Sequence, residues 1–257
     1  MKIVILTTLA FFCLVQLFAQ TDTLSAKVYS WNSLDIKKDS SRDRAQILDG
    51  GTYDLANLEI HASTLDPGKA PHPPHSHADA EELIIIKEGM LKVTINGKTR
   101  TMGAGSVAMA MPGDQHGFEN GGNTKTTYYV IKFKAKAPQD VPRAQQAGGS
   151  FLIDWNDLKA EKTDKGERRQ VFDRATSQFP RFEMHVTALN AGEVSHAPHQ
   201  HIAEEIILLR KGNVQMQVGN NFYRFIAGDL VFLNTGVLHA LKNTGDTQCE
   251  YFAFQFH

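Results

Sequence analysis

The chain repeats itself with a shift of 124 residues, and this duplication limits its fold more than any other feature. The segment LEIHASTLDPGKAPHPPHSH, residues 58–77, aligns without a gap on FEMHVTALNAGEVSHAPHQH, residues 182–201. After a one-residue deletion the shift becomes 123 and pairs His116 with His239. Ten of the 11 histidines fall into such pairs. Because imidazole is the commonest metal ligand in proteins, the pattern indicates two copies of one metal-binding unit.

The duplication also suggests the domain boundaries. The only two tryptophans, Trp31 and Trp155, keep the same 124-residue shift, so each repeat begins upstream of its histidines. Between the repeats lies KAPQDVPRAQQAGGS, residues 136–150, whose Pro, Gln, Gly and Ala content is typical of a linker. We therefore expect an N-terminal domain over residues 21–135 and a C-terminal domain over residues 151–257.

The first 20 residues, MKIVILTTLAFFCLVQLFAQ, are typical of a secretory signal peptide. Lys2 precedes an apolar run, and the small Ala19 precedes a polar stretch. The run is too short and too weakly flanked for a stable membrane span, and the bulky residues before Cys13 disfavour lipid attachment there. Its removal leaves Cys249 as the only cysteine, which excludes an intrachain disulfide. We expect a periplasmic or secreted protein.

Charge excludes some classes of partner. The formal net charge is −1, and 21% of the residues are charged, with both signs mixed along the chain. One small basic cluster, residues 165–169, is typical of a solvated loop. The sequence therefore predicts neither nucleic-acid binding nor attraction to an anionic membrane.

The apolar pattern predicts an all-β fold. Short apolar runs alternate with turn residues, and no amphipathic helix longer than two turns is evident. The expected strands of the first repeat are 83–87, 90–95, 98–102, 107–111 and 126–135, and those of the second are 206–209, 214–218, 222–226, 230–233 and 250–256. The Asn96-Gly97 pair predicts a type I′ hairpin. Many short antiparallel strands favour a sandwich or a closed barrel.

Each repeat carries a set of metal-ligand residues at the same spacing. Two histidines are spaced H-x-H, which on an extended strand places both rings on one face. A glutamate follows at the start of the next strand, and a third histidine comes about 34 residues later. The two sets are His75, His77, Glu82, His116 and His199, His201, Glu205, His239. Three imidazoles and one carboxylate suit a divalent transition metal, and an octahedral shell leaves two positions open.

These motifs resemble those of the cupin superfamily. HPPHSHADAEELIIIKEG and PGDQHGFEN are similar to its two conserved motifs, and HQHIAEEIILLRKG with GDLVFLNTGVLHALKN repeats them, with Asn234 where the family usually has proline. The resemblance covers nearly all of the chain after the signal peptide. It implies a bicupin of two tandem jelly-roll (double-stranded β-helix) barrels. It also implies that the eight residues above hold one divalent transition metal per domain, whether Fe, Mn, Cu, Ni or Zn.

Each ligand glutamate has an acidic neighbour, so the choice between them needs an argument. Only Glu82 and Glu205 keep the family's six-residue separation from the following glycine. Glu81 and Glu204 then point to the opposite face of the strand. We expect these two to be surface groups or groups that support the ligands.

Three further sets of duplicated residues have two interpretations each: His72 and His196; Glu59 with His61 and Glu183 with His185; Arg44 and Arg168. The first set either supports the metal ligands or contacts a substrate, or else it packs at the barrel rim. The second is either a proton-transfer couple or a structural hydrogen bond. The third either binds a substrate carboxylate or forms an ion pair that closes the barrel.

The resemblance does not fix the reaction, because cupins include enzymes, sugar binders and storage proteins. Open coordination positions and complete ligand sets favour a metal-dependent enzyme, dioxygenase- or decarboxylase-like and leaning to oxidoreductase chemistry, that acts on a small oxygen-rich organic molecule. The alternatives are a non-catalytic cupin that binds metal or sugar, and a metal-dependent isomerase or hydrolase. Barrels of this family often pair, so a homodimer is expected.

Overall fold

The computed structural model of the chain describes residues 23–257. The predicted signal peptide lies outside the described residues. None of the helices within residues 23–257 is long and apolar enough to cross a membrane. The described part is built almost entirely of strands, which confirms the predicted all-β class.

The strands of the first repeat are β1 (Lys27–Tyr29), β2 (Ile36–Lys38), β3 (Asp43–Gly50), β4 (Leu55–Leu65), β5 (Glu81–Glu88), β6 (Met90–Ile95), β7 (Lys98–Gly103), β8 (Val107–Ala110), β9 (His116–Asn120) and β10 (Thr126–Ala135). The strands of the second repeat are β11 (Phe151–Ile153), β12 (Glu161–Thr163), β13 (Gly166–Arg174), β14 (Phe182–Leu189), β15 (Glu204–Lys211), β16 (Asn213–Val218), β17 (Asn221–Ile226), β18 (Leu230–Leu233), β19 (His239–Asn243) and β20 (Cys249–Phe256). The helical elements of the described chain are α1 (Val141–Gln146) and 3-10 turns at Trp31–Ser33 and Trp155–Asp157.

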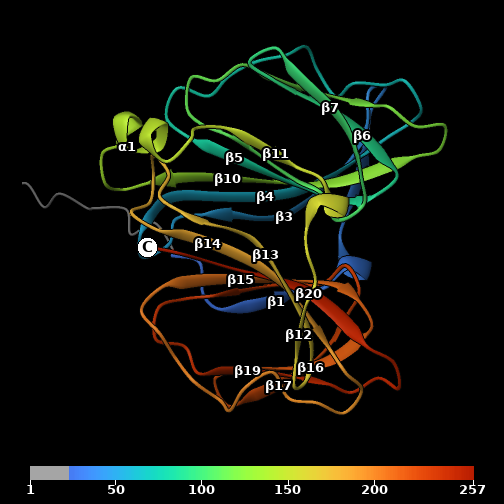
Figure 1. Cartoon of the computed structure of the whole chain (residues 1–257), viewed down its shortest axis with the longest axis vertical. Coiled ribbons are helices and arrows are strands. Elements are labelled where there is room, and N and C mark those ends of the chain that lie inside the picture. Colours follow the sequence, from blue (N-terminus) through green and yellow to red (C-terminus); the bar gives the residue numbers. More distant parts are fainter. Residues whose placement is uncertain (1–22) are drawn as a thin grey trace, which may run out of the picture.

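Each half of the molecule is a barrel made of one large and one small antiparallel sheet. The large sheets have seven strands, in the orders β11-β8-β5-β10-β4-β3-β2 and β1-β18-β15-β20-β14-β13-β12. The small sheets have three strands, in the orders β7-β6-β9 and β17-β16-β19. In Figure 1 the two large sheets face each other across the middle of the molecule, and the small sheets lie at its two outer ends.

The hydrophobic core has three parts, and the large sheets are buried on both faces. One cluster fills each barrel, and the third joins residues of both large sheets. On β5, Ile84 and Ile86 belong to the barrel cluster, whereas Leu83 and Ile85 belong to the cluster between the halves. Burial of both faces explains why this strand is a continuous apolar run instead of an alternating one.

The two halves exchange their edge strands. Strand β1 pairs with β18 of the second half, with Val28 opposite Val231. Strand β11 pairs with β8 of the first half, with Leu152 opposite Ala108. The predicted domain boundaries follow the sequence repeats, but each large sheet takes one strand from the other repeat.

Local turn chemistry agrees with two of these elements. Asn96 and Gly97 have φ values of 48° and 77°, as a type I′ turn requires, and they join β6 to β7 as predicted.

The predicted linker also contains helix α1, which the sequence analysis did not anticipate. Asp140 caps this helix by accepting a hydrogen bond from the Arg143 amide. Asp140 followed by Pro142 is a helix-start signal.

Candidate metal centres in the two barrels

The four predicted ligands of the first repeat converge at one end of its barrel. His75 Nε2 lies 3.2 Å from His77 Nε2, and His77 Nε2 lies 3.0 Å from Glu82 Oε2. Nε2 of His116 lies 3.4 Å from the other oxygen of Glu82. All four residues offer ligand atoms within 4.8 Å of one another.

The second repeat builds a similar cluster. His199, His201 and His239 offer ring nitrogens within 4.8 Å of one another. Glu205 joins them because its Oε2 lies 3.1 Å from Nε2 of both His201 and His239. The structure thus brings the whole first set together, and in the second set it brings the three histidines together with Glu205 against two of them.

The backbone around the H-x-H pairs differs from the sequence prediction. His75 and His77 lie outside the named strands, in a loop, and not on a regular strand as predicted. His75 instead forms an isolated antiparallel bridge with His116, through two backbone hydrogen bonds of 2.9 and 2.8 Å. His199 and His239 form the same bridge. This pairing holds the first and last ligands of each set opposite each other.

Both donor sets fit a metal ion. Bonds of about 2.1 Å to one ion place neighbouring ligand atoms about 3.0–3.4 Å apart, for angles from octahedral to tetrahedral. The separations above match that range. The Nε2 atoms of His116 and His239 are buried and have no hydrogen-bond partner among the described residues. Buried polar atoms are normally satisfied, so these two nitrogens point to an ion as their partner.

Hydrogen bonds at Nδ1 fix three of the ligand rings so that Nε2 of each can bind an ion. His116 Nδ1 donates to the Asp114 carbonyl at 2.9 Å, and His239 Nδ1 donates to the Val237 carbonyl at 2.8 Å. His201 Nδ1 donates in the same way to the Ala203 carbonyl. A proton on Nδ1 leaves the Nε2 lone pair facing the cluster, which is how metal-ligating histidines are usually fixed.

The electrostatics of the clusters keep the carboxylates ionised. Burial opposes ionisation, but the close imidazoles of His116 and His77 outweigh it and hold the pKa of Glu82 far below its usual range. The close imidazoles of His201 and His239 likewise lower the pKa of Glu205 to about 2. Burial and the neighbouring imidazoles lower the pKa of His75 to about 4. Neutral imidazole and ionised carboxylate are the forms that bind a cation.

The two extra histidines lie against the clusters. The His72 ring stands edge-on to the His75 ring, with centroids 4.3 Å apart, and His196 does the same to His199 at 4.0 Å. Each also lines the cavity beside its cluster. Both therefore contact a ligand histidine and border the space where a substrate can lie.

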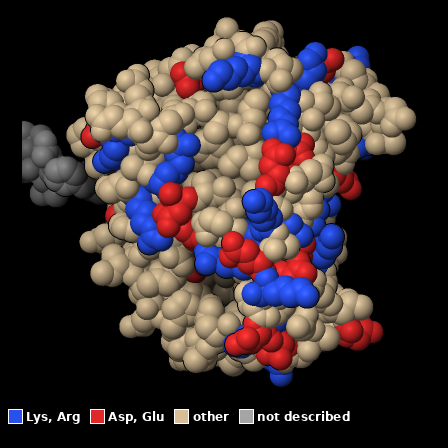
Figure 2. Space-filling model, in the orientation of Figure 1, with Lys and Arg blue, Asp and Glu red and all other residues tan. Residues whose placement is uncertain are grey.

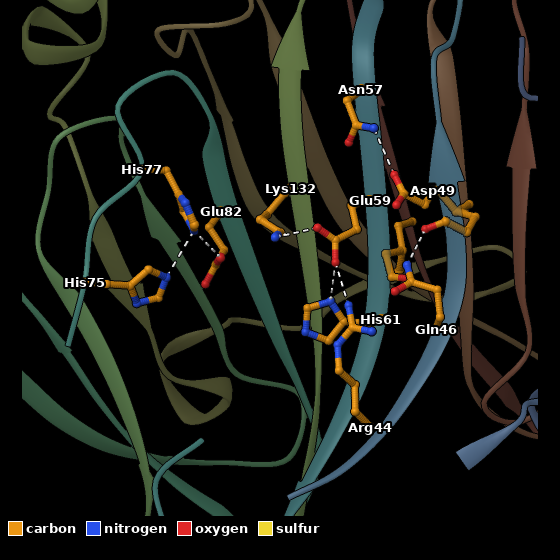
Figure 3. A network of polar contacts seen from close by, with 12 residues as sticks. Arg44, Gln46, Asp49, Asn57, Glu59, His61, His75, His77, Glu82 and Lys132 are labelled. Carbon is orange, nitrogen blue, oxygen red and sulfur yellow. Dashed lines mark hydrogen bonds and ion pairs between the residues drawn. The ribbon is translucent and has the colours of Figure 1, made fainter. Parts of the chain in front are cut away.

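A charged network adjoins the first cluster (Figure 3). Glu59 is paired with Arg44 at 2.7 Å, with His61 at 3.1 Å and with Lys132 at 2.5 Å. In this view Lys132 lies between Glu59 and the His77–Glu82 pair. Arg44 thus forms an ion pair inside the barrel, one of its two predicted interpretations.

The second half keeps this network but loses its lysine. Glu183 accepts from Arg168 at 2.9 Å and from Gln170 at 3.0 Å, and His185 Nδ1 lies 2.9 and 3.1 Å from its two oxygens. Gln255 stands at the position that matches Lys132. It lies beside the metal-ligand set instead, with its Nε2 3.3 Å from His201 Nε2.

The cavities beside the two clusters differ greatly in size. The C-terminal cavity has about 430 Å³ and the N-terminal one about 110 Å³. Three pairs of matching lining residues differ in side-chain volume or charge: Phe118 and Leu241, Val130 and Ala253, Lys132 and Gln255. Sequence analysis did not identify these positions as functional. The 123-residue shift pairs them, but only the structure shows that they line the cavities.

The structure corrects the expectation that Glu81 and Glu204 lie on the surface. They do face away from the barrel interior, but their side chains are completely buried instead of lying on the surface. Glu81 accepts hydrogen bonds from the backbone and hydroxyl of Ser177 in the other half, and Glu204 accepts from Thr52 and from the Tyr53 amide. The expectation failed because that face of the large sheet packs against the other half and not against water.

Comparison with known families agrees with this geometry. The Cupin domain family matches the chain twice, over residues 62–132 and 185–254. The chain belongs to the cupin family. Its two family matches place one cupin domain in each barrel, which confirms the predicted bicupin. No curated protein sequence is significantly similar to it.

Solved structures share this two-barrel cupin fold at low sequence identity. Protein Ylba from E. coli matches with a TM-score of 0.71 and 14% identity, over 94% of this chain and 95% of that one. AerE from Microcystis aeruginosa matches with 0.67 and 15%, over 87% and 97%. The oxalate decarboxylase of Lactobacillus farciminis, in a formate complex, matches with 0.69 and 16%, over 91% and 87%. At such identities the likeness shows the fold.

The surface of this cupin agrees with the charge analysis. On the face shown in Figure 2, positive and negative side chains alternate within the same bands, and no broad field of one sign is visible. The absence of nucleic-acid binding and the homodimer both stay predictions.

Proposed function

We propose that the protein is a metal-dependent enzyme whose substrate, a small oxygen-rich organic molecule, binds in the C-terminal barrel. One observation carries the proposal: His199, Glu205 and His239 of the C-terminal ligand set line a cavity of about 430 Å³. Ligand pockets range over about 300–1,000 Å³. The cavity lining mixes apolar side chains with charged ones, which suits a molecule with a carbon skeleton and several oxygens.

The four ligand residues would hold a divalent transition metal, which supplies Lewis-acid chemistry and stabilises negative charge on a substrate oxygen. The other lining residues would select and orient the substrate. The lining carries both charge signs, with Lys165 and Arg168 beside Asp164 and Glu167. Ile207, Leu241 and Ala253 add apolar surface to it. Within this proposal the reaction is dioxygenase- or decarboxylase-like, which rests on the complete ligand sets and the leaning to oxidoreductase chemistry drawn from the sequence.

The N-terminal centre supports a second, non-catalytic function. Its cavity of about 110 Å³ is below the usual range for substrates. Lys132 fills part of it and neutralises Glu59. We infer that this centre holds a metal without turning over the same substrate. We also propose that the protein lies outside the cytoplasm, and this rests on the signal-like first 20 residues alone.

Metal analysis and ligand binding test the proposal together. Protein purified with and without air is analysed for bound metals, then tested for oxygen consumption and for carbon dioxide release with a panel of phenols, organic acids and sugar acids. We expect one metal per barrel and turnover that His199→Ala abolishes. His75→Ala is the matched control, because it removes the same ligand from the smaller cavity.

Two outcomes contradict the proposal. Metal-loaded protein that consumes no oxygen, releases no carbon dioxide and binds no member of the panel would leave a storage or structural role. Equal ligand binding by wild type and His199→Ala would place the ligand away from the metal.

A further inference from the structure

The Glu–His couples of the two halves share a sequence pattern but have different surroundings. His61 and His185 occupy matching positions on β4 and β14, each two residues after the glutamate that it contacts. The side chain of His61 is 6% exposed and that of His185 is 20% exposed. The residue opposite His61 on β10 is Val130, whereas the residue opposite His185 on β20 is the smaller Ala253. The second imidazole therefore borders the large cavity.

Glu183 fixes the orientation of the His185 ring. Both of its oxygens lie within hydrogen-bond distance of Nδ1, at 2.9 and 3.1 Å. A carboxylate accepts only, so Nδ1 carries the proton and Nε2 keeps its lone pair. No described residue forms a hydrogen bond with this Nε2. The charged groups that share the cavity with it are Asp164, Lys165, Glu167, Arg168 and Glu205.

The N-terminal couple carries one more cation than the C-terminal couple. An arginine pairs with the glutamate in both halves, Arg44 with Glu59 and Arg168 with Glu183, but Lys132 adds a second cation at Glu59 where the second half has Gln255. Burial and the nearby Arg44 charge act against the protonated form of His61 and lower its pKa. Arg42 also lines this small cavity, where the second half has Gly166. His61 thus serves as a structural hydrogen-bond partner.

We infer that His185, positioned by Glu183, is the proton acceptor for a substrate hydroxyl in the C-terminal cavity. The substrate O–H bond breaks, its electron pair stays on the substrate oxygen, and the proton forms an N–H bond at Nε2. The resulting imidazolium is stabilised by the Glu183 carboxylate at Nδ1. Positioned general bases of this kind contribute about 10²–10⁴-fold to rate. The inference rests on the proposed function, because the hydroxyl belongs to that substrate.

Proton counting tests this role independently of turnover. The probe is 4-nitrocatechol, a hydroxylated molecule whose visible absorbance reports its ionisation. Its binding to metal-loaded protein at pH 7 is measured by calorimetry in buffers of different ionisation heat, which gives the number of protons released. We expect His185→Gln to release one more proton than the wild type and to bind at least tenfold more weakly. His61→Gln is the matched control, and it should release the same number as the wild type.

Two further measurements separate positioning from structure. Glu183→Gln should keep the metal content and the thermal midpoint near the wild-type values but bind the probe more weakly, because a neutral amide stabilises an imidazolium less. Nitrogen NMR of the ligand-free protein should show the His185 proton on Nδ1. Equal proton release by wild type and His185→Gln, or a proton on Nε2, overturns the inference and leaves the proposed function standing. Failure of the metal-loaded wild type to bind either 4-nitrocatechol or any member of the substrate panel overturns both.

Discussion

At the scale of single residues, the two metal clusters are alike and the walls around them are not. The ligands keep their identities in both halves, but Leu241 and Ala253 replace bulkier residues of the first half. Each replacement removes side-chain volume from a wall of the cavity. A few wall residues therefore distinguish the two cavities.

The double substitution Leu241→Phe with Ala253→Val should close the C-terminal cavity. These changes install the residues of the N-terminal cavity, so we expect probe binding to weaken at least tenfold while two metals stay bound. Calorimetry with 4-nitrocatechol and elemental analysis measure the two effects. The reciprocal change, Phe118→Leu with Val130→Ala, enlarges the other cavity and serves as the control. Its expected cost is about 1–4 kcal/mol of stability from lost core volume. Unchanged probe affinity in the first variant would show that the ligand binds elsewhere.

The eight ligands were predictable from sequence because their residue types are rare and their spacing is repeated. The cavity walls were not, since Leu241 and Ala253 are ordinary apolar residues whose significance depends on which face of the strand they occupy. The expectation for Glu81 failed for a similar reason. The alternation of side chains along the strand gave the correct face for Glu81, but it could not show that this face packs against the other half of the molecule.

At the scale of elements, the exchanged strands are anchored by the two tryptophans. A side chain added at Gly105 would come within 2.5 Å of the Trp155 ring, and one added at Gly228 within 2.9 Å of Trp31. Both glycines also have positive φ, at 91° and 98°. Each tryptophan thus rests on a glycine of the opposite half, next to the strand that it carries across.

Gly105→Ala and Gly228→Ala should each destabilise the protein by about 2–5 kcal/mol, from strained backbone together with overpacking. The free energy of unfolding in urea measures this cost. Gly97→Ala is the matched control, because Gly97 has φ 77° but no neighbouring atom within 4 Å of the added carbon. It should lose only the backbone part, about 1–3 kcal/mol. Equal losses at all three positions would mean that the tryptophan contacts contribute little.

Sequence analysis found the hairpins at this scale but missed the exchange. The turn at Asn96-Gly97 is local, so two residues determine it. The pairing of β1 with β18 joins residues about 200 positions apart, and a three-residue strand carries no pattern that names its partner.

At the scale of the whole molecule, two buried glutamates join the halves reciprocally. Glu81 and Glu204 each accept hydrogen bonds from a turn of the other half, and burial raises the pKa of both. A raised pKa means that the folded state holds the proton more tightly than the unfolded state does. Their contribution to stability is therefore fully present below the ordinary glutamate pKa, and it is lost as the pH rises through the folded-state value.

Glu81→Gln should flatten this pH dependence. The amide mimics the protonated acid: its oxygen can accept from Ser177 and Gln178 as the carboxyl oxygen does, and it carries no charge to bury. We expect the wild type to lose stability relative to the variant as the pH rises from about 4.5. Urea unfolding at a series of pH values measures the difference. Parallel curves for the two proteins would show that Glu81 does not titrate differently on folding.

The two halves should not fold separately, because each completes the other. The sheet of either half lacks an edge strand without its partner, and the aromatic cluster between the halves would meet water. Phe133 of the first half contacts Phe182 and Phe256 of the second, with ring centroids 5.2 Å apart in both pairs.

We expect fragments 21–135 and 151–257 to unfold without cooperativity when each is produced alone. When the two are mixed, cooperative unfolding and the near-ultraviolet circular dichroism signal should both return. Exposure of a large apolar face is the physical reason, since such faces cause aggregation in isolated domains. A full-length chain cleaved within residues 136–140 is the control, because it keeps every strand and should stay folded. A cooperative, metal-binding fragment 151–257 on its own would mean that β1 and the other half are dispensable for the second barrel.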